Sequence, residues 1–103
     1  MKTYQVIISN KARESLKTIV DYIKEDSPSA AEKVKKTLIK EAKSLSKFPE
    51  RYSKEEQLID KPGNYRSFVK WHYKLVYKVE QKEVQILNIV HTSRKPSVMK
   101  KIV

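Results

Sequence analysis

The chain has 103 residues, of which 39% are hydrophobic and 34% are charged, and it contains one glycine and no cysteine. This size and composition fit one globular domain over residues 1–103 and exclude a disordered protein. The lack of cysteine excludes thiol catalysis and cysteine-ligated zinc. Without a signal-peptide pattern or an apolar run of membrane-spanning length, we expect a soluble, cytoplasmic protein.

The net charge of +11 arises from 23 basic and 12 acidic residues. Residues 1–50 hold 11 basic and 7 acidic residues, whereas residues 51–103 hold 12 and 5. A positive charge of this size attracts nucleic acid, a ribosomal surface or an acidic protein. The alternative is that the charge serves solubility alone. The sequence therefore favours an acidic macromolecular partner, contacted mainly by the second half of the chain.

The first 24 residues predict a strand followed by a helix. Residues 3–9 (TYQVIIS) are rich in β-branched and aromatic side chains, which favours a strand. Asn10 is a suitable N-cap for the helix, which should end near Lys24. Five apolar residues then recur at helical spacing and form one face of that helix: Ala12, Leu16, Ile19, Val20 and Ile23.

A second helix is predicted from the Ser-Pro-Ser segment to about Lys47, before Phe-Pro. Pro28 suits the first turn of a helix, and both Ser27 and Ser29 are candidate N-caps, the latter in a capping box with Glu32. Two amphipathic helices with so short a link should lie antiparallel and need an apolar surface to pack on.

The second half of the sequence predicts a three-stranded meander, which provides the apolar surface for the two helices. Residues 50–60 are polar and predict a loop, and the Pro-Gly sequence in 61–64 indicates a tight turn. Strands are predicted at Tyr65–Trp71, Tyr73–Glu80 and Glu83–His91. The predicted fold class is α+β, in the order β-α-α-β-β-β, with the helical hairpin on one face of a mainly antiparallel four-stranded sheet.

Strand alternation predicts two chemically different faces for this meander. Leu75, Tyr77 and Val79 should face the helices. Four cations should lie together on the open face and form one basic surface: Arg66, Lys70, Lys74 and Lys78. The alternative is a solvated sheet face whose lysines serve solubility.

Aromatic residues and two histidines lie in the same basic region. Trp71 fits either base stacking beside cations or a packed core, and Tyr77 fits the core. His72 and His91 have the chemistry of acid–base catalysts, yet neither has a nucleophile or metal ligand beside it in the sequence, so structural roles stay open. We find no phosphate-cradling loop, paired carboxylates or metal-ligand cluster, and we expect no metal and no cofactor.

Several segments together resemble the RelE/ParE superfamily of bacterial type II toxin–antitoxin systems, which includes plasmid-stabilisation proteins. The resemblance covers nearly the whole chain. It is carried by SPSAAEK, LSKFPE, NYRSFVKWHYKLVYKVE and ILNIVHTSRKP. The resemblance implies a growth-inhibiting toxin neutralised by an antitoxin, with the +11 charge suited to an acidic antitoxin segment and a hetero-oligomer as a possible assembly.

The superfamily implies two modes of action. RelE-like members are ribosome-dependent mRNA endonucleases that need no metal and use basic residues to stabilise charge on the reacting phosphate. At the corresponding positions of this chain, the resemblance implies Arg66, Lys74 and Arg94 as the residues for this reaction, with His91 as a further candidate. Phe68 stands where another cation is common, and Lys74 stands where arginine is usual, so its bidentate fork is lost. No tyrosine follows Arg94, and Met99 lies nearest to the expected place.

ParE-like members inhibit DNA gyrase and are not enzymes. The long helical hairpin and the HTSRKP segment favour this branch slightly, whereas the high charge favours the ribosome. Lys70, Lys78, Trp71 and Lys95 are the candidate contacts to a nucleic acid or protein target. A non-toxic basic nucleic-acid-binding module is the third alternative.

Overall fold

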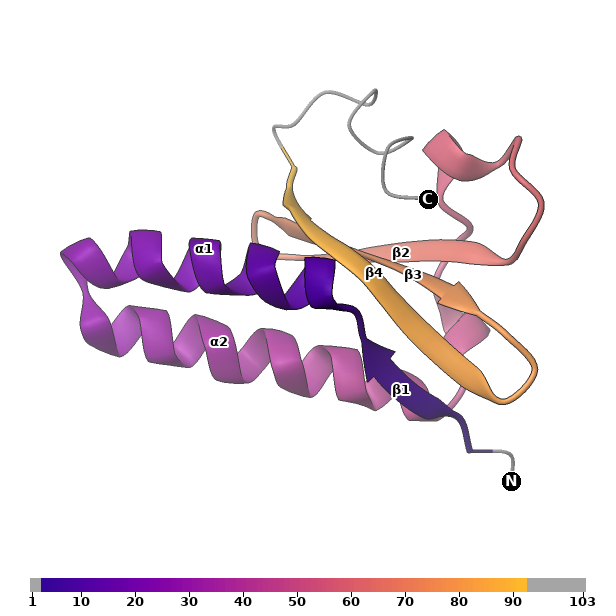
Figure 1. Cartoon of the computed structure of the whole chain (residues 1–103), viewed down its shortest axis with the longest axis horizontal. Helices are drawn as coiled ribbons and strands as arrows, with labels where there is room; N and C mark the ends of the chain where they lie inside the picture. Colours follow the sequence, from indigo (N-terminus) through magenta and orange to yellow (C-terminus); the bar gives the residue numbers. More distant parts are fainter. Residues whose placement is uncertain (1–2, 93–103) are drawn as a thin grey trace.

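The computed structural model describes residues 3–92 of the chain. Its fold is a four-stranded sheet with both helices on one face (Figure 1). The strands are β1 (Gln5–Ile8), β2 (Tyr65–Lys70), β3 (Tyr73–Val79) and β4 (Glu83–His91). The helices are α1 (Asn10–Asp26) and α2 (Pro28–Lys43). Three short 3-10 turns lie between α2 and β2: η1 (Ser44–Ser46), η2 (Pro49–Arg51) and η3 (Glu56–Leu58).

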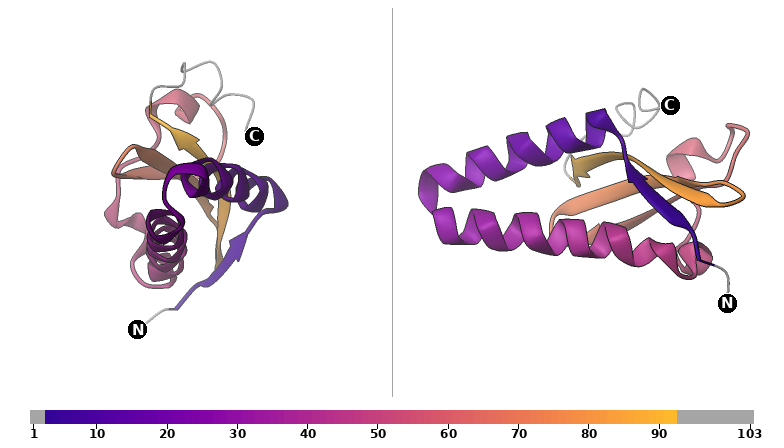
Figure 2. Two further views of the ribbon diagram at one scale, coloured as in Figure 1. Left: turned by 90° about the vertical axis from the view of Figure 1, so that its left-hand side faces the viewer. Right: turned by 60° about the horizontal axis from the view of Figure 1, so that its bottom comes forward.

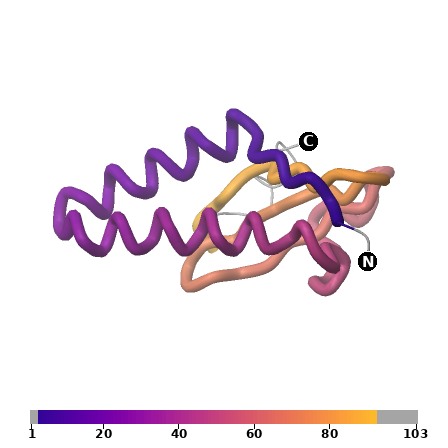
Figure 3. The backbone as a smooth tube through the Cα atoms, turned by 90° about the horizontal axis from the view of Figure 1, so that it is seen from below, coloured from indigo at the N-terminus to yellow at the C-terminus, as the bar shows by residue number. Residues whose placement is uncertain are grey.

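The strand order across the sheet is β1-β4-β3-β2. The first strand pairs in parallel with the last, Gln5 opposite Glu83 and Ile8 opposite Ile86, while the other two pairs are antiparallel. The predicted α+β class, element order and mainly antiparallel sheet are confirmed. The turn of the α1–α2 hairpin projects beyond the strands, so the sheet covers only part of the hairpin (Figures 2 and 3).

Serine side chains begin both helices. Ser9, and not the predicted Asn10, is the N-cap of α1: its hydroxyl accepts from the backbone N–H of Ala12 at 3.1 Å and donates to the carbonyl of Leu87 at 3.0 Å. Ser27 is the N-cap of α2, ahead of Pro28. This settles the choice between Ser27 and Ser29.

The predicted end of the second helix near Lys47 is four residues too late. The α-helix ends at Lys43, and η1 continues as a tighter 3-10 turn. Helices often end in such a turn, because it satisfies some of the last carbonyl groups. The first helix runs two residues beyond the expected Lys24, to Asp26.

The main core lies between the helices and the sheet. As predicted, Leu75, Tyr77 and Val79 belong to it, together with Leu16 and Leu38 from the two helices. Tyr77 is fully buried, and its hydroxyl donates to the carbonyl of Pro49 at 2.5 Å. Burial raises the pKa of Tyr77 to about 12, so its hydroxyl stays protonated and serves as a donor.

The other face of the sheet is not open, contrary to our expectation. Leu58, Val76 and Val90 are buried in a second, smaller cluster. The segment predicted as a polar loop at 50–60 supplies Leu58, and it also buries the carboxylate of Glu55. This segment therefore belongs to the packed structure.

Candidate functional site

Arg66, a predicted catalytic cation, is held by four hydrogen bonds inside the protein. Its guanidinium donates to the side chain of Asn64 at 2.9 Å, to the carbonyl of Tyr52 at 2.7 Å, and to both the carbonyl and the carboxylate of Glu50 at 3.3 and 3.2 Å. Only 14% of the side chain is exposed. Arg66 therefore fastens residues 50–52 to strand β2.

Lys74, the second predicted catalytic cation, forms an ion pair with a buried carboxylate. Its Nζ lies 2.9 Å from Oε1 of Glu55, a residue that is only 2% exposed. The hydroxyl of Ser67 and the backbone N–H of Gln57 also donate to this carboxylate, each at 2.8 Å. Burial alone would raise the pKa of Glu55, but these three donors outweigh it and hold the pKa below its usual value.

The predicted single basic surface is wrong, and the strand register gives the reason. Arg66 lies opposite Tyr77 and Lys70 opposite Tyr73, whereas Lys74 lies opposite Val69 and Lys78 opposite Tyr65. Residues directly opposite each other in an antiparallel pair project from the same face. The two cations of β2 are therefore on the helix-facing side of the sheet, and the two cations of β3 are on the other side.

The turn between β2 and β3 gathers three other predicted site residues. We call Lys70, Trp71, His72, Tyr73 and His91 the turn cluster. The Nζ of Lys70 lies 5.2 Å from the centroid of the Trp71 ring, and the two histidine rings are stacked at 5.9 Å. The Tyr73 ring meets His91 edge-on at 5.8 Å. This cluster places two imidazoles, a cation and an indole at one end of the sheet.

The remaining predicted contacts lie elsewhere. Lys78 is at the far end of β3 from the turn cluster, with its Nζ 5.5 Å from the Tyr65 ring centroid. Arg94 and Lys95 lie outside the described residues. The structure thus brings Lys70, Trp71 and His91 together, and it separates them from Arg66.

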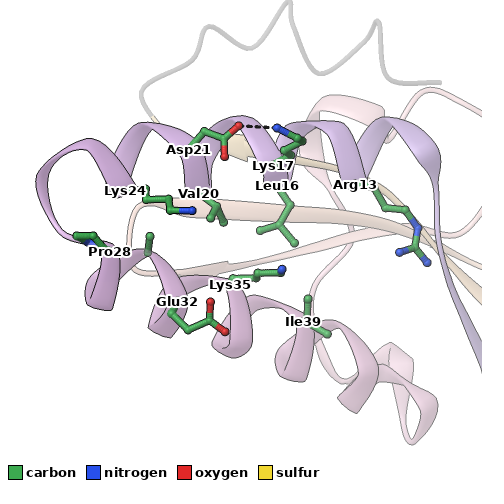
Figure 4. Close-up of a pocket in the computed structure, with 11 residues that line it drawn as sticks. Arg13, Leu16, Lys17, Val20, Asp21, Lys24, Pro28, Glu32, Lys35 and Ile39 are labelled. Atoms are coloured by element: carbon green, nitrogen blue, oxygen red, sulfur yellow. Dashed lines mark hydrogen bonds and ion pairs between the residues drawn. The ribbon is translucent and has the colours of Figure 1, made fainter.

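The α1–α2 hairpin carries a groove of about 440 Å³ that the sequence did not reveal (Figure 4). Leu16 and Val20 from α1 and Ile39 from α2 point into the space between the helices. Charged residues form the rim: Arg13, Lys17, Lys24, Lys35, Asp21 and Glu32. Both carboxylates already have lysine partners one helical turn away, so the rim presents an excess of positive charge.

Within the described residues 3–92, no group of three or more histidine or acidic side chains could hold a metal ion. No helix in that part of the chain is long and apolar enough to cross a membrane.

Comparison with known proteins supports a family assignment. The family model described as the ParE toxin of the type II toxin–antitoxin system parDE matches residues 6–96. No curated protein matches the chain.

Two solved structures have the same fold. A structure of a chromosomal ParDE toxin–antitoxin system from P. aeruginosa is 23% identical, covers 88% of this chain and 98% of its own, and has a TM-score of 0.71. The RelBE2 toxin–antitoxin complex from Mycobacterium tuberculosis is also 23% identical, with coverages of 91% and 97% and a TM-score of 0.63. This likeness shows the fold, and the family model matches most of the chain. The chain therefore belongs to the ParE toxin family of type II toxin–antitoxin systems.

Proposed function

We propose that this toxin acts as a ParE-like inhibitor of DNA gyrase, through a protein contact and without cutting RNA. The observation that carries the proposal is the internal use of Arg66 and Lys74. A nuclease needs exposed cations aimed at the phosphate on which charge develops. Here the first cation holds a loop and the second neutralises a buried carboxylate. The match to the ParE model favours the same branch.

A RelE-like mRNA endonuclease is the second candidate, and the turn cluster is the observation that favours it. His72 and His91 are exposed, and they lie at the same end of the sheet as Lys70. An exposed imidazole near a cation is suited to proton transfer at a phosphate.

The deciding experiment tests purified toxin against both targets in parallel. We expect loss of negative supercoiling by DNA gyrase as toxin is added, and no cleavage of mRNA on programmed ribosomes. Codon-phased cuts in the mRNA, with supercoiling unaffected, would refute the proposal and support the endonuclease.

We further propose that the hairpin groove receives an acidic amphipathic segment of the cognate antitoxin. An apolar floor with a cationic rim is complementary to a helix that has one apolar face and flanking carboxylates. The projecting end of the hairpin, which the sheet leaves uncovered, makes the groove accessible. The +11 net charge of the chain adds long-range attraction for such a segment.

Reversing two charges on the rim should weaken antitoxin binding selectively. In the Lys24→Glu/Lys35→Glu variant we expect the dissociation constant to rise roughly tenfold at low salt, with a smaller effect at high salt, because exposed charges are screened. Calorimetric titration with the antitoxin measures both values. The Lys11→Glu/Lys40→Glu variant changes the net charge equally but lies outside the groove, and it should bind normally. Equal weakening in both variants would argue against the groove.

A further inference from the structure

Trp71 occupies a backbone conformation that tryptophan rarely adopts. It is the first residue of the two-residue turn between β2 and β3, and its φ is 57°. Glycine, asparagine and aspartate are the usual residues at positive φ in such turns, because a larger side chain crowds the backbone there. The turn therefore carries local strain, which in folded proteins concentrates at functional sites.

Packing within the described residues 3–92 does not account for this tryptophan. Trp71 is 44% exposed, and it belongs to neither of the two buried clusters. The Nζ of Lys70 lies over its ring at 5.2 Å, which places a cation beside the indole without burying it. The hydrogen bond from the Thr92 N–H to the His72 carbonyl, at 2.9 Å, anchors the turn to the end of β4. Trp71 thus lies in a turn that is hydrogen-bonded to the end of β4.

We propose that Trp71 and Lys70 form the anchor by which this toxin binds its cellular target, a folded protein with an acidic rim around an apolar pocket. The inference rests on the proposed protein-directed function. Tryptophan is enriched among the residues that dominate binding energy at interfaces, where it fills a desolvated pocket. A side chain fixed in place before binding loses little conformational entropy on association.

The charges that residues 3–92 place around the turn favour a protein over a nucleic acid. Proteins that bind single strands combine stacking rings with a groove of cations that follows the phosphates. On β3 the nearest lysine, Lys74, is neutralised by Glu55, and Lys78 lies at the other end of that strand. Within the described residues, the turn therefore presents one lysine beside one indole and no cationic track.

The shape of the turn favours a folded target over the antitoxin segment. Trp71 is partly exposed in the turn at the end of a hairpin, so we infer that the receptor for its indole is concave. A single helix or extended segment does not form a pocket by itself, whereas a folded protein does. The antitoxin segment is better matched to the groove between α1 and α2, on the projecting hairpin.

Replacing Trp71 should separate stability from activity. For Trp71→Gly and Trp71→Asn we expect a thermal midpoint equal to or above that of the wild type, because both residues accept positive φ. We also expect the toxin concentration for half-inhibition of gyrase supercoiling to rise about 30-fold, as for an interface hot spot of about 2 kcal/mol. Growth arrest after induction should weaken in parallel.

Tyr22→Ala is the matched control, since Tyr22 is an exposed aromatic residue, 74% accessible, on α1. It should leave inhibition unchanged. If both Trp71 variants inhibit gyrase like the wild type, the anchor is refuted while the proposed function stands. If the wild type does not inhibit gyrase, yet growth arrest is lost in stable Trp71 variants, the anchor stands and gyrase is the wrong target. A lower midpoint in both variants would show a structural tryptophan and overturn the inference.

Tryptophan fluorescence tests the nucleic-acid alternative directly, because Trp71 is the chain's one tryptophan. We expect no quenching when a single-stranded oligonucleotide is added at moderate salt. Saturable quenching, with a salt slope that reports several phosphate contacts, would overturn the protein-anchor inference.

Discussion

Replacing Lys74 by alanine is expected to lower the free energy of unfolding by about 3 kcal/mol, since removing one partner of a buried ion pair strands the other charge. The stranded group is the carboxylate of Glu55, which would keep only Ser67 and Gln57 as donors. We take the lower end of the usual range because 27% of the lysine side chain is exposed. For a domain of about 100 residues, this corresponds to a fall in Tm of roughly 12 to 24 °C, measurable by calorimetry.

A double substitution distinguishes a structural role of Lys74 from a catalytic one. In Lys74→Met/Glu55→Gln both charges are gone. The amide oxygen can take the place of Oε2 and accept from the Gln57 N–H, while the amide NH2 in the place of Oε1 can donate to the hydroxyl oxygen of Ser67. We expect it to recover at least half of the lost stability. A Lys74→Ala variant that is fully stable but no longer toxic would instead indicate a direct role of the ammonium group.

The same carboxylate gives the protein an acid-sensitive contribution to stability. Because the folded-state pKa of Glu55 lies below its ordinary value of 4.5, the ionised form stabilises the fold. This contribution is fully present above pH 4.5 and is lost as the pH falls through the lowered folded-state pKa. Denaturant unfolding at a series of pH values should show the loss in the wild type and a weaker one in Lys74→Met/Glu55→Gln.

Replacing Arg66 by alanine is expected to cost about 2 to 3 kcal/mol, because hydrogen bonds from a charged donor are lost and their acceptors are left unpaired. Its guanidinium joins Asn64, Glu50 and Tyr52 in one network. Arg66→Lys should rescue little, since one ammonium group cannot reproduce the planar fork. Urea unfolding gives the free energy, and amide hydrogen exchange should show residues 50–52 opening first.

Lys70→Ala is the control for Arg66, since it removes a cation from the same strand. It should change stability by less than about 0.5 kcal/mol. If Arg66→Ala retains full stability and loses toxicity, Arg66 acts on the target, and the endonuclease becomes the better proposal.

Local sequence pattern was sufficient for the element order, whereas the cap of the first helix depended on a distant contact. The Ser-Pro sequence at residues 27–28 predicts the start of the second helix because both signals are local. For the first helix, the hydroxyl of Ser9 is also tied to Leu87, 78 positions later in the chain. No short-range pattern contains that bond, so Asn10 was the wrong choice.

The basic surface could not be predicted without the strand register. The two-residue turn at Trp71 and His72 pairs Lys70 with Tyr73, so even-numbered residues of β2 share a face with odd-numbered residues of β3. Counting the residues in this turn would have separated Arg66 from Lys74. The burial of Glu55 has no such signal, because its segment is mainly polar and is buried by its contacts with the sheet.

The parallel pairing of β1 with β4 has a consequence for how the toxin is made. Ile8 pairs with Ile86, so most of the chain lies in the loop that this pairing closes. Closing so long a loop is a slow step in folding. During synthesis, α1 and α2 emerge long before the strand that they cover. A nascent toxin therefore exposes the apolar face of its hairpin until β4 arrives, and a chain broken before Glu83 would lack the strand that joins β1 to the rest of the sheet.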